Sequence, residues 1–332
     1  MSIAVVGAGI NGLATAVQIQ TEEPRAKVTV IADRFSPNTL SDLVAGLWSP
    51  YLLGETPHEL IRRWSVPTLQ HTWRLAWTDP DNSGASISSG YFFSDVPFED
   101  QPFDVSGLVR NFRCVERAQI RDIGVQERQF GYFFTSTLLE PRYYLPYLTK
   151  QFELNGGVFI KRNLLNIDEL GPSKYDVVVN CTGLGARALV GDSRVYPIRG
   201  QVARLHAPWQ KQFLLFGTNE LEYHLLPSRD SVLLGTTAQV DDWSQNYRDE
   251  DFSKVLSGIS QYVPWVKNAV VKQRVVGHRP ARTSVRLERE QLRGQRVVHN
   301  YGHGGAGVTL HYGCALHAAE LALQALHSKA RL

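Results

Sequence analysis

The sequence is poor in cysteine and has no long apolar run. Its three cysteines, Cys114, Cys181 and Cys314, are too few and too scattered among 332 residues for a disulfide framework or a zinc cluster. No apolar run reaches the ~18 residues that a membrane span needs. Because 35 Lys and Arg nearly balance 32 Asp and Glu, the chain is also a poor candidate for binding nucleic acid. We therefore expect a soluble, intracellular protein that binds neither membranes nor nucleic acid.

Metal-binding patterns are absent as well. The ten histidines include no H-E-x-x-H motif. His299 and His303 are four residues apart, but they flank a glycine-rich turn rather than sharing a helix face. We therefore predict no metal site.

What remains is a globular composition, with 43% hydrophobic and 20% charged residues. At roughly 150 residues per domain, the length predicts about two domains. We find no internal repeat and no low-complexity segment. The chain enters an apolar run directly after Met1-Ser2, with no charged leader and no cleavage site of a signal peptide.

The first 33 residues predict one strand–helix–strand unit. Residues 3–6 are apolar and β-branched, and Gly7-Ala8-Gly9-Ile10-Asn11-Gly12 follows them. A helix with a broad apolar face comes next, Pro24 ends it, and residues 28–32 form a second buried strand. Asp33 closes that strand, 21 residues after the last glycine of the motif.

Each part of this unit has a physical role in binding a dinucleotide. Gly7 permits the tight turn, Gly9 lets the backbone approach a pyrophosphate, and Gly12 lets helix and strand pack closely. The N-terminus of the helix offers free N–H groups and a positive dipole to the anion. Asp33 is suited to accept hydrogen bonds from a ribose diol, whereas the adjacent Arg34 would meet a phosphate or stack on adenine.

The rest of the chain combines a loop-rich segment with segments that have clear helix and strand patterns. Residues 49–137 are rich in aromatic residues, prolines and polar loops, without a second strand–helix–strand unit. Further along we predict a helix at 138–154, strands at 158–160 and 176–180, an antiparallel sheet from the runs 200–205, 213–216, 222–226 and 231–236, a helix at 252–262, and a C-terminal strand (297–300), glycine turn (302–307) and long helix (308–326).

Two of these features favour FAD over NAD(P). NAD(P) dehydrogenases usually continue with more strand–helix–strand units, and this chain does not. The strand at 176–180 runs into Cys181-Thr182-Gly183, as in flavoproteins. The C-terminal glycine turn would direct a second set of N–H groups at the charge that develops on a reduced flavin.

At this point the sequence resembles the FAD-dependent D-amino-acid oxidase and D-aspartate oxidase family. The matching segments are 32–35, 45–48, 179–183, 199–202, Arg279-Pro280 with Arg282, 285–288 and 299–305. The resemblance implies an α/β (overall α+β) fold, in which a Rossmann-type FAD domain is interleaved with a β-sheet substrate domain. We assign residues 1–50, 138–195 and 277–332 to the FAD domain, and residues 51–137 and 196–276 to the substrate domain.

The resemblance also implies a reaction. A D-amino acid loses its α-hydrogen as hydride to flavin N5, and the imino acid hydrolyses to a 2-oxo acid and ammonia. Oxygen then reoxidises the flavin and gives hydrogen peroxide. Catalysis in this family is mainly orientation and electrostatics. The alternatives are a D-aspartate oxidase, an oxidase for glycine or another amine, and a flavin-binding protein that has lost its activity.

The resemblance assigns five residues to the substrate site. Arg286 is expected to clamp the carboxylate, because a guanidinium binds it bidentately, and the carbonyl of Gly305 to accept from the amine. Counting back from Pro227, His224 stands at the place of a family tyrosine and Tyr223 stands one residue earlier. Only one of the two should face the substrate, because adjacent strand residues point to opposite faces. Tyr51 follows the D-amino-acid oxidase pattern.

A larger set is expected to hold FAD. It comprises Gly7, Ala8, Gly9, Ile10, Gly12, Asp33, Arg34, Thr39, Ser41, Ala45, Gly46, Leu47, Asn163, Thr182, Gly183, Gly304, Gly307, Val308 and Thr309.

Substrate preference is read from departures within the family. Residues 183–187 and 191–193 resemble the aspartate oxidases, yet Gly235-Thr236-Thr237-Ala238 lacks the arginine that those enzymes carry in the matching Gly-Gly-Thr-Arg stretch for the second carboxylate. Ala306 is small where some relatives carry a tyrosine. We therefore favour neutral or a broad range of D-amino acids.

The C-terminal Ala330-Arg331-Leu332 has the small–basic–leucine pattern of the Ser-Lys-Leu peroxisomal signal, although a frayed helix end would look the same. A peroxide-forming enzyme favours the peroxisome, with its import receptor as partner, over the cytoplasm. A homodimer stays open as the assembly.

Overall fold

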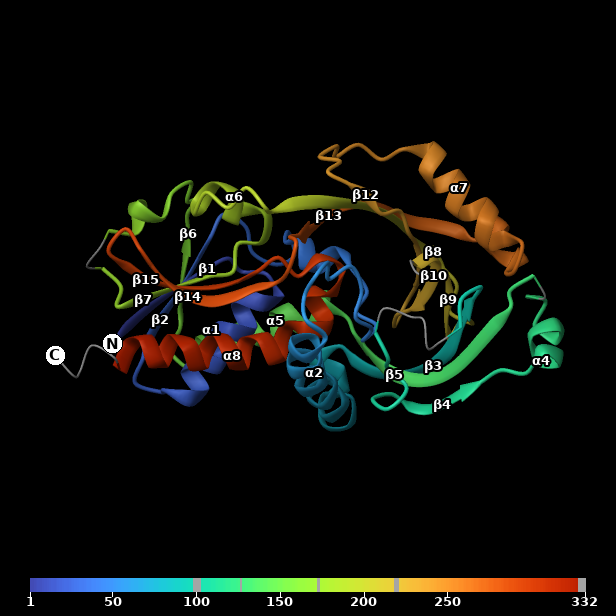
Figure 1. Ribbon diagram of the computed structural model, residues 1–332, viewed down its shortest axis with the longest axis horizontal. Helices are drawn as coiled ribbons and strands as arrows, with labels where there is room; N and C mark the ends of the chain where they lie inside the picture. The colour runs from blue at the N-terminus through green and yellow to red at the C-terminus, as the bar shows by residue number, and fades with distance from the viewer. Residues whose placement is uncertain (98–102, 126, 172–173, 218–220, 328–332) are drawn as a thin grey trace. The chain divides into compact units, whose positions relative to one another are not determined.

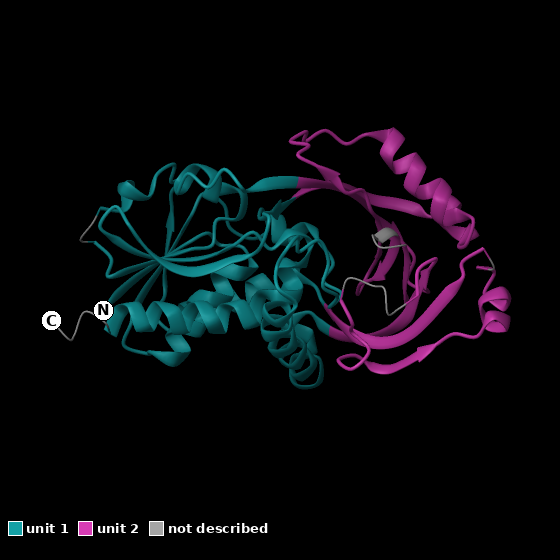
Figure 2. Ribbon diagram, in the orientation of Figure 1, with its two compact units in different colours: residues 1–85, 139–197, 279–332 teal, residues 86–138, 198–278 magenta. Residues whose placement is uncertain are grey.

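The computed structural model describes residues 1–332 except 98–102, 126, 172–173, 218–220 and 328–332 (Figure 1). It divides into two compact units, each assembled from separate stretches of chain (Figure 2). Unit 1 comprises residues 1–85, 139–197 and 279–332, and unit 2 comprises residues 86–138 and 198–278.

Unit 1 is built on a six-stranded sheet with the order β14-β15-β7-β1-β2-β6. Its strands are β1 (Ser2–Val6), β2 (Lys27–Ala32), β6 (Val158–Lys161), β7 (Val177–Asn180), β14 (Arg286–Leu292) and β15 (Gln295–Tyr301). All neighbouring strands run parallel except β14, which is antiparallel to β15. This sheet confirms the predicted opening strand–helix–strand unit.

Both faces of this sheet are buried, which explains its continuous apolar strands. Alternate residues of β1 enter different cores: Ile3 and Val5 pack with helices α1 (Ile10–Glu22), α5 (Pro141–Leu154) and α8 (Gly307–His327). Ala4 and Val6 pack on the other face against Ile167, Leu170 and Leu189. Helices α1 and α8 lie side by side beneath the sheet (Figure 1).

Helix α2 (His58–Thr78) corrects two expectations. The aromatic, proline and polar residues of 49–137 indicated mainly loops. This segment instead contains α2, which is 21 residues long although Pro67 lies within it. We had also assigned residues 51–137 to the substrate domain, whereas residues 51–85 belong to unit 1. The reason is packing: Gly313 of α8 leaves no room for a side chain beneath the backbone of Trp64, and its N–H donates to Thr68 Oγ1 at 3.0 Å.

Unit 2 is built on a nine-stranded sheet with the order β12-β8-β11-β10-β9-β3-β5-β4, and β13 pairs with β8. Its strands are β3 (Ala85–Ser94), β4 (Arg110–Cys114), β5 (Phe130–Leu139), β8 (Tyr196–His206), β9 (Phe213–Gly217), β10 (Leu221–Pro227), β11 (Val232–Gly235), β12 (Gln239–Val240) and β13 (Val270–Ala281). Strands β8, β11, β10 and β9 form the predicted antiparallel sheet. Helix α7 (Asp249–Ser260) covers one face, where Val255 and Ile259 join the core of unit 2.

The remaining elements are short. They are the helices α3 (Pro80–Ser83), α4 (Arg117–Asp122) and α6 (Ala186–Leu189), and the 3₁₀ turns η1 (Leu40–Leu43), η3 (Ile167–Leu170), η4 (Gly183–Gly185), η5 (Pro264–Asn268) and η6 (Gly304–Ala306). The predicted helix at 138–154 begins later, at Pro141, because β5 continues to Leu139.

Candidate functional site

The glycine motif after β1 forms a turn that admits no side chains. Gly7 has φ +108°, and a Cβ added to it would lie 2.5 Å from the carbonyl oxygen of Cys181. A Cβ on Gly12 would collide with the carbonyl of Gly7. Strands β1 and β7 therefore end in backbone that packs directly on the start of α1, which is the geometry of a dinucleotide turn.

Ser41 closes the cradle at the N-terminus of α1. Its Oγ accepts the N–H of Ile10 at 3.1 Å and would lie 3.2 Å from a Cβ on Gly9. Thr39 caps η1, but its hydroxyl donates to Asp42 Oδ2 at 2.7 Å rather than reaching α1. A helix N-terminus with a hydroxyl beside it suits a phosphate group, so the residues present fit a pyrophosphate.

The residues predicted to bind the ribose and adenine lie at the same edge of the sheet. Asp33 follows β2, and Asn163 follows β6, which pairs with β2 in parallel. Arg34 Nε lies 3.0 Å from Asp33 Oδ2, and both side chains are exposed. The carboxylate therefore stays accessible to a ribose diol.

Thr182 is oriented by a chain of hydrogen bonds from the interior. Asn180 Oδ1 accepts both the N–H and the hydroxyl of Thr182, at 3.2 and 2.7 Å. His299 lies beside Asn180 on β15, and burial together with the charge of Arg286 lowers its pKa. Its Nε2 lies 2.8 Å from Glu290 Oε2 and its Nδ1 lies 3.5 Å from Asn180 Nδ2, so the tautomer with its proton on Nε2 donates to Glu290 and accepts from Asn180.

The segment 45–52 lies along the second glycine turn. Gly46 admits no side chain because the carbonyl of Leu139 and Cγ1 of Val308 occupy the space. Thr309 Oγ1 donates to the carbonyl of Ser49 at 2.9 Å. A Cβ on Gly305 would lie 2.5 Å from Cδ1 of Tyr51. Three predicted groups therefore meet in unit 1: Ala45, Gly46 and Leu47; Gly304, Gly305, Gly307, Val308 and Thr309; and Tyr51.

Arg286 does not fit the expected carboxylate clamp. It donates to Glu288 at 2.7 Å, to Glu290 at 2.9 Å and to the hydroxyl of Tyr301 at 2.9 Å. Burial would lower its pKa, but these acceptors raise it. A guanidinium committed to two carboxylates is a poor receptor for a third. The sequence contains the signal: Arg286, Glu288 and Glu290 share one strand face at a spacing of two.

Arg279, at the end of β13, is the guanidinium that stands beside the predicted substrate residues. Its central carbon lies 5.9 Å from the centre of the Tyr51 ring, and Tyr51 contacts Gly305. Although Arg279 is partly exposed, burial of its guanidinium lowers its pKa, and Tyr51 opposes that shift. An arginine in a poorly hydrated position beside an aromatic face is suited to bind a carboxylate.

Tyr223 and His224 point to opposite faces of the unit 2 sheet. Tyr223 packs on α7, where a Cβ added to Gly258 would overlap its ring. His224 stands opposite Gly235 on β11, and a Cβ added there would overlap the imidazole. Tyr223 therefore lies on the face that α7 covers, and the buried His224 lies on the other face.

Unit 1 also contains a largely buried histidine–tyrosine cluster that the sequence did not predict. The hydroxyl of Tyr144 lies 2.9 Å from Nε2 of His71 and 3.3 Å from Nε2 of His311. Burial lowers the pKa of His71 to about 3 and that of His311 to about 4. These rings are neutral at physiological pH and contribute to packing.

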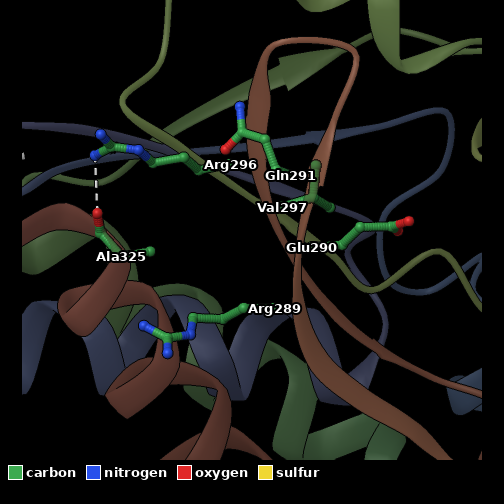
Figure 3. A pocket seen from close by; sticks show the side chains of 6 residues that line it. All are labelled: Arg289, Glu290, Gln291, Arg296, Val297 and Ala325. Carbon is green, nitrogen blue, oxygen red and sulfur yellow. Dashed lines mark hydrogen bonds between the residues drawn. The ribbon is translucent and has the colours of Figure 1, made fainter. Parts of the chain in front are cut away.

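A polar hollow of about 190 Å³ lies between the β14–β15 hairpin and the end of α8 (Figure 3). Arg289, Glu290, Gln291, Arg296, Val297 and Ala325 line it. Arg296 donates to the carbonyl of Ala325 at 2.8 Å. None of these six residues belongs to the predicted site.

Among the residues with described positions, no helix combines the length and apolar character needed to cross a membrane. Nor do three or more His, Cys, Asp or Glu side chains in those ranges gather closely enough to hold a metal ion. The predicted peroxisomal signal, Ala330-Arg331-Leu332, lies outside the described residues.

Comparison with known proteins covers nearly the whole chain. Residues 2–321 match the family model described as FAD dependent oxidoreductase. A D-aspartate oxidase from Homo sapiens is 39% identical, over 98% of this chain and 96% of its own length. A D-amino acid oxidase from Dugesia ryukyuensis is 34% identical, over 97% of both chains.

A solved structure shares the fold at low identity. The glycine oxidase from Geobacillus kaustophilus has a TM-score of 0.80 and 16% identity, over 97% of this chain and 94% of its own. Together, the family match, the full-length relatives and the dinucleotide turn show that the chain belongs to the family of FAD-dependent oxidoreductases and uses FAD.

Proposed function

We propose that this protein oxidises D-amino acids to 2-oxo acids, with release of ammonia and hydrogen peroxide. The similarity to D-aspartate and D-amino acid oxidases along almost the entire chain is the observation that carries the proposal. When bound, FAD supplies the acceptor for the hydride that leaves the α-carbon. The residues of the chain hold the substrate and orient it.

Arg279 is our proposed carboxylate receptor, in place of Arg286. Its guanidinium lies against Tyr51, and Tyr51 lies against Gly305, so one small region of unit 1 holds a cation, a phenol and a backbone carbonyl. An amino acid carries a carboxylate and an amine on one carbon. A guanidinium for the carboxylate and a carbonyl oxygen for the amine match that pair of groups.

Oxidation of acidic D-amino acids is the second candidate, favoured by the 39% identity to D-aspartate oxidase. One departure from the aspartate oxidases favours neutral substrates instead. Gly235-Thr236-Thr237-Ala238 matches their Gly-Gly-Thr-Arg stretch but ends in Ala238 instead of the arginine. A methyl side chain provides no charge for a second carboxylate.

The test is an anaerobic flavin-bleaching panel on the purified protein, with D-alanine, D-aspartate, D-arginine, glycine and L-alanine. We expect yellow protein that D-alanine bleaches and L-alanine does not. Bleaching by D-aspartate alone would establish the second candidate. If glycine bleaches the flavin as fast as D-alanine, the protein is a less selective amine oxidase. If no D-amino acid reduces bound flavin, the proposal is wrong.

Peroxisomal import is a separate prediction that rests on the chemistry of Ala330-Arg331-Leu332. A fluorescent protein fused ahead of residues 321–332 should enter peroxisomes in cultured cells, and the same fusion without the last three residues should stay in the cytoplasm. Identical distributions would favour the cytoplasmic alternative. Sedimentation of the holoenzyme will decide whether it is a homodimer.

A further inference from the structure

Asn11 places an amide between the N-termini of two helices. It is the second residue of α1, and its Nδ2 lies 3.6 Å from the point where a Cβ on Gly307 would stand, at the first residue of α8. Its Oδ1 is buried and has no hydrogen-bond partner within the described part of the chain. The backbone carbonyl of Asn11 accepts the hydroxyl of Thr15 at 2.6 Å.

A buried amide oxygen without a donor is costly, at about 1–3 kcal/mol, and buried polar groups in native proteins are almost always paired. The neighbouring backbone cannot supply the donor, because the N–H of Ile10 already reaches Ser41 at 3.1 Å. A bound molecule that carries a hydrogen-bond donor would satisfy this oxygen.

His303 is a second residue beside Gly307 that has an unpaired polar atom. Its Cβ lies 3.9 Å from the same point on Gly307, and its Nε2 is also buried with no partner among described residues. Burial and the charge of His311 lower the pKa of His303 to about 4, so its ring is neutral at physiological pH. Two unpaired polar atoms therefore belong to residues on either side of Gly307.

The need for a hydrogen-bond donor limits which part of FAD can pair with Asn11 Oδ1. Phosphate oxygens at the α1 cradle only accept hydrogen bonds, so a pyrophosphate cannot pair with Asn11 Oδ1. The ribose diol is expected at Asp33, beyond the end of β2. FAD carries one further set of hydroxyl groups, on the ribityl chain that joins the pyrophosphate to the flavin ring. We propose that Asn11 Oδ1 accepts a hydrogen bond from a ribityl hydroxyl of FAD.

The test separates the ribityl chain from the phosphates by using two probes. FAD dissociation is measured from the flavin fluorescence released when holoenzyme is diluted. ADP, which has the adenosine and pyrophosphate but no ribityl chain, is measured as a competitor of FAD. Asn11→Ala and the similarly sized Asn11→Leu are compared with Thr21→Ala, which removes an exposed polar group at the other end of α1.

We expect both Asn11 variants to raise the dissociation constant of FAD about tenfold, which is the loss of about one hydrogen bond. The dissociation constant of ADP should change less than twofold, and Thr21→Ala should change neither. Equal weakening of FAD and ADP would assign Asn11 to the phosphates and overturn the proposal. So would unchanged FAD binding in Asn11→Leu, which keeps the side-chain volume if Asn11→Ala fails to fold.

Discussion

The guanidinium of Arg279 lies 5.9 Å from the centre of the Tyr51 ring, although 228 positions separate the two residues along the chain. Tyr51 in turn contacts Gly305, so three separate segments of unit 1 meet at this point. The pair combines a cation of lowered pKa with an aromatic face, which favours an anionic group bound beside it.

Arg279→Met should therefore raise the KM for D-alanine by about 30-fold or more, since loss of a charge-assisted contact costs about 2 kcal/mol or more. FAD affinity should be unchanged. Steady-state oxygen uptake measures this, and Arg286→Met is the matched control. If Arg286→Met shows the higher KM and Arg279→Met does not, the original assignment of the clamp was right.

Arg286→Met should instead destabilise the fold. Arg286 helps to lower the pKa of Glu290, so its removal leaves that carboxylate with one partner fewer. It also removes the guanidinium that donates a hydrogen bond to the hydroxyl of Tyr301. Because Glu288 and Glu290 are partly exposed, we expect a modest loss of about 1–2 kcal/mol in urea unfolding. Arg289→Met, at an exposed position of the same strand, should cost less than about 0.5 kcal/mol. Equal losses in the two variants would contradict this role.

The buried histidines predict a loss of stability in mild acid. His71, His303 and His311 have pKa values lowered to about 3, 4 and 4, against about 6.5 in the unfolded chain. The unfolded state therefore binds more protons between pH 6.5 and 4. The histidines' contribution to the free energy of unfolding is fully present above pH 6.5. It falls as the pH decreases, by about 1 kcal/mol per pH unit for each histidine.

Urea unfolding of the holoenzyme between pH 4.5 and 7.5 measures this slope. His303→Gln, which removes one titrating ring, should flatten it by about one third of the histidine contribution. A profile independent of pH over this range would show that the three rings are protonated in the folded protein.

Tyr223→Phe should leave substrate kinetics unchanged, because Tyr223 packs against α7. His224→Phe should change the KM for D-amino acids several-fold, because the predicted substrate contact then belongs to the buried ring of His224, on the other face over Gly235. Oxygen-uptake kinetics of the two variants make the comparison. A larger effect of Tyr223→Phe would reverse the assignment of faces.

Much of unit 1 could be predicted because its signals are local. The glycine turn requires Gly7, Gly9 and Gly12 in fixed order between a strand and a helix, so contiguous residues reveal it. Helix α2 was missed because prolines and aromatic residues obscure its period, and its packing on α8 comes from a segment far along the chain. For the same reason, the sequence analysis assigned residues 51–85 to the substrate domain, whereas they belong to unit 1.

The sequence by itself determined the dinucleotide turn and the antiparallel sheet, since each follows from periodicity and spacing within short segments, and its resemblance to known oxidases indicated the FAD family. Tertiary structure alone decided which of the two arginines lies beside Tyr51. Ion pairs with Glu288 and Glu290 occupy Arg286, whereas the fold brings Arg279 to Tyr51. It also decided which of Tyr223 and His224 faces α7, because a side chain's surroundings depend on strands and helices that pack against it from elsewhere in the chain.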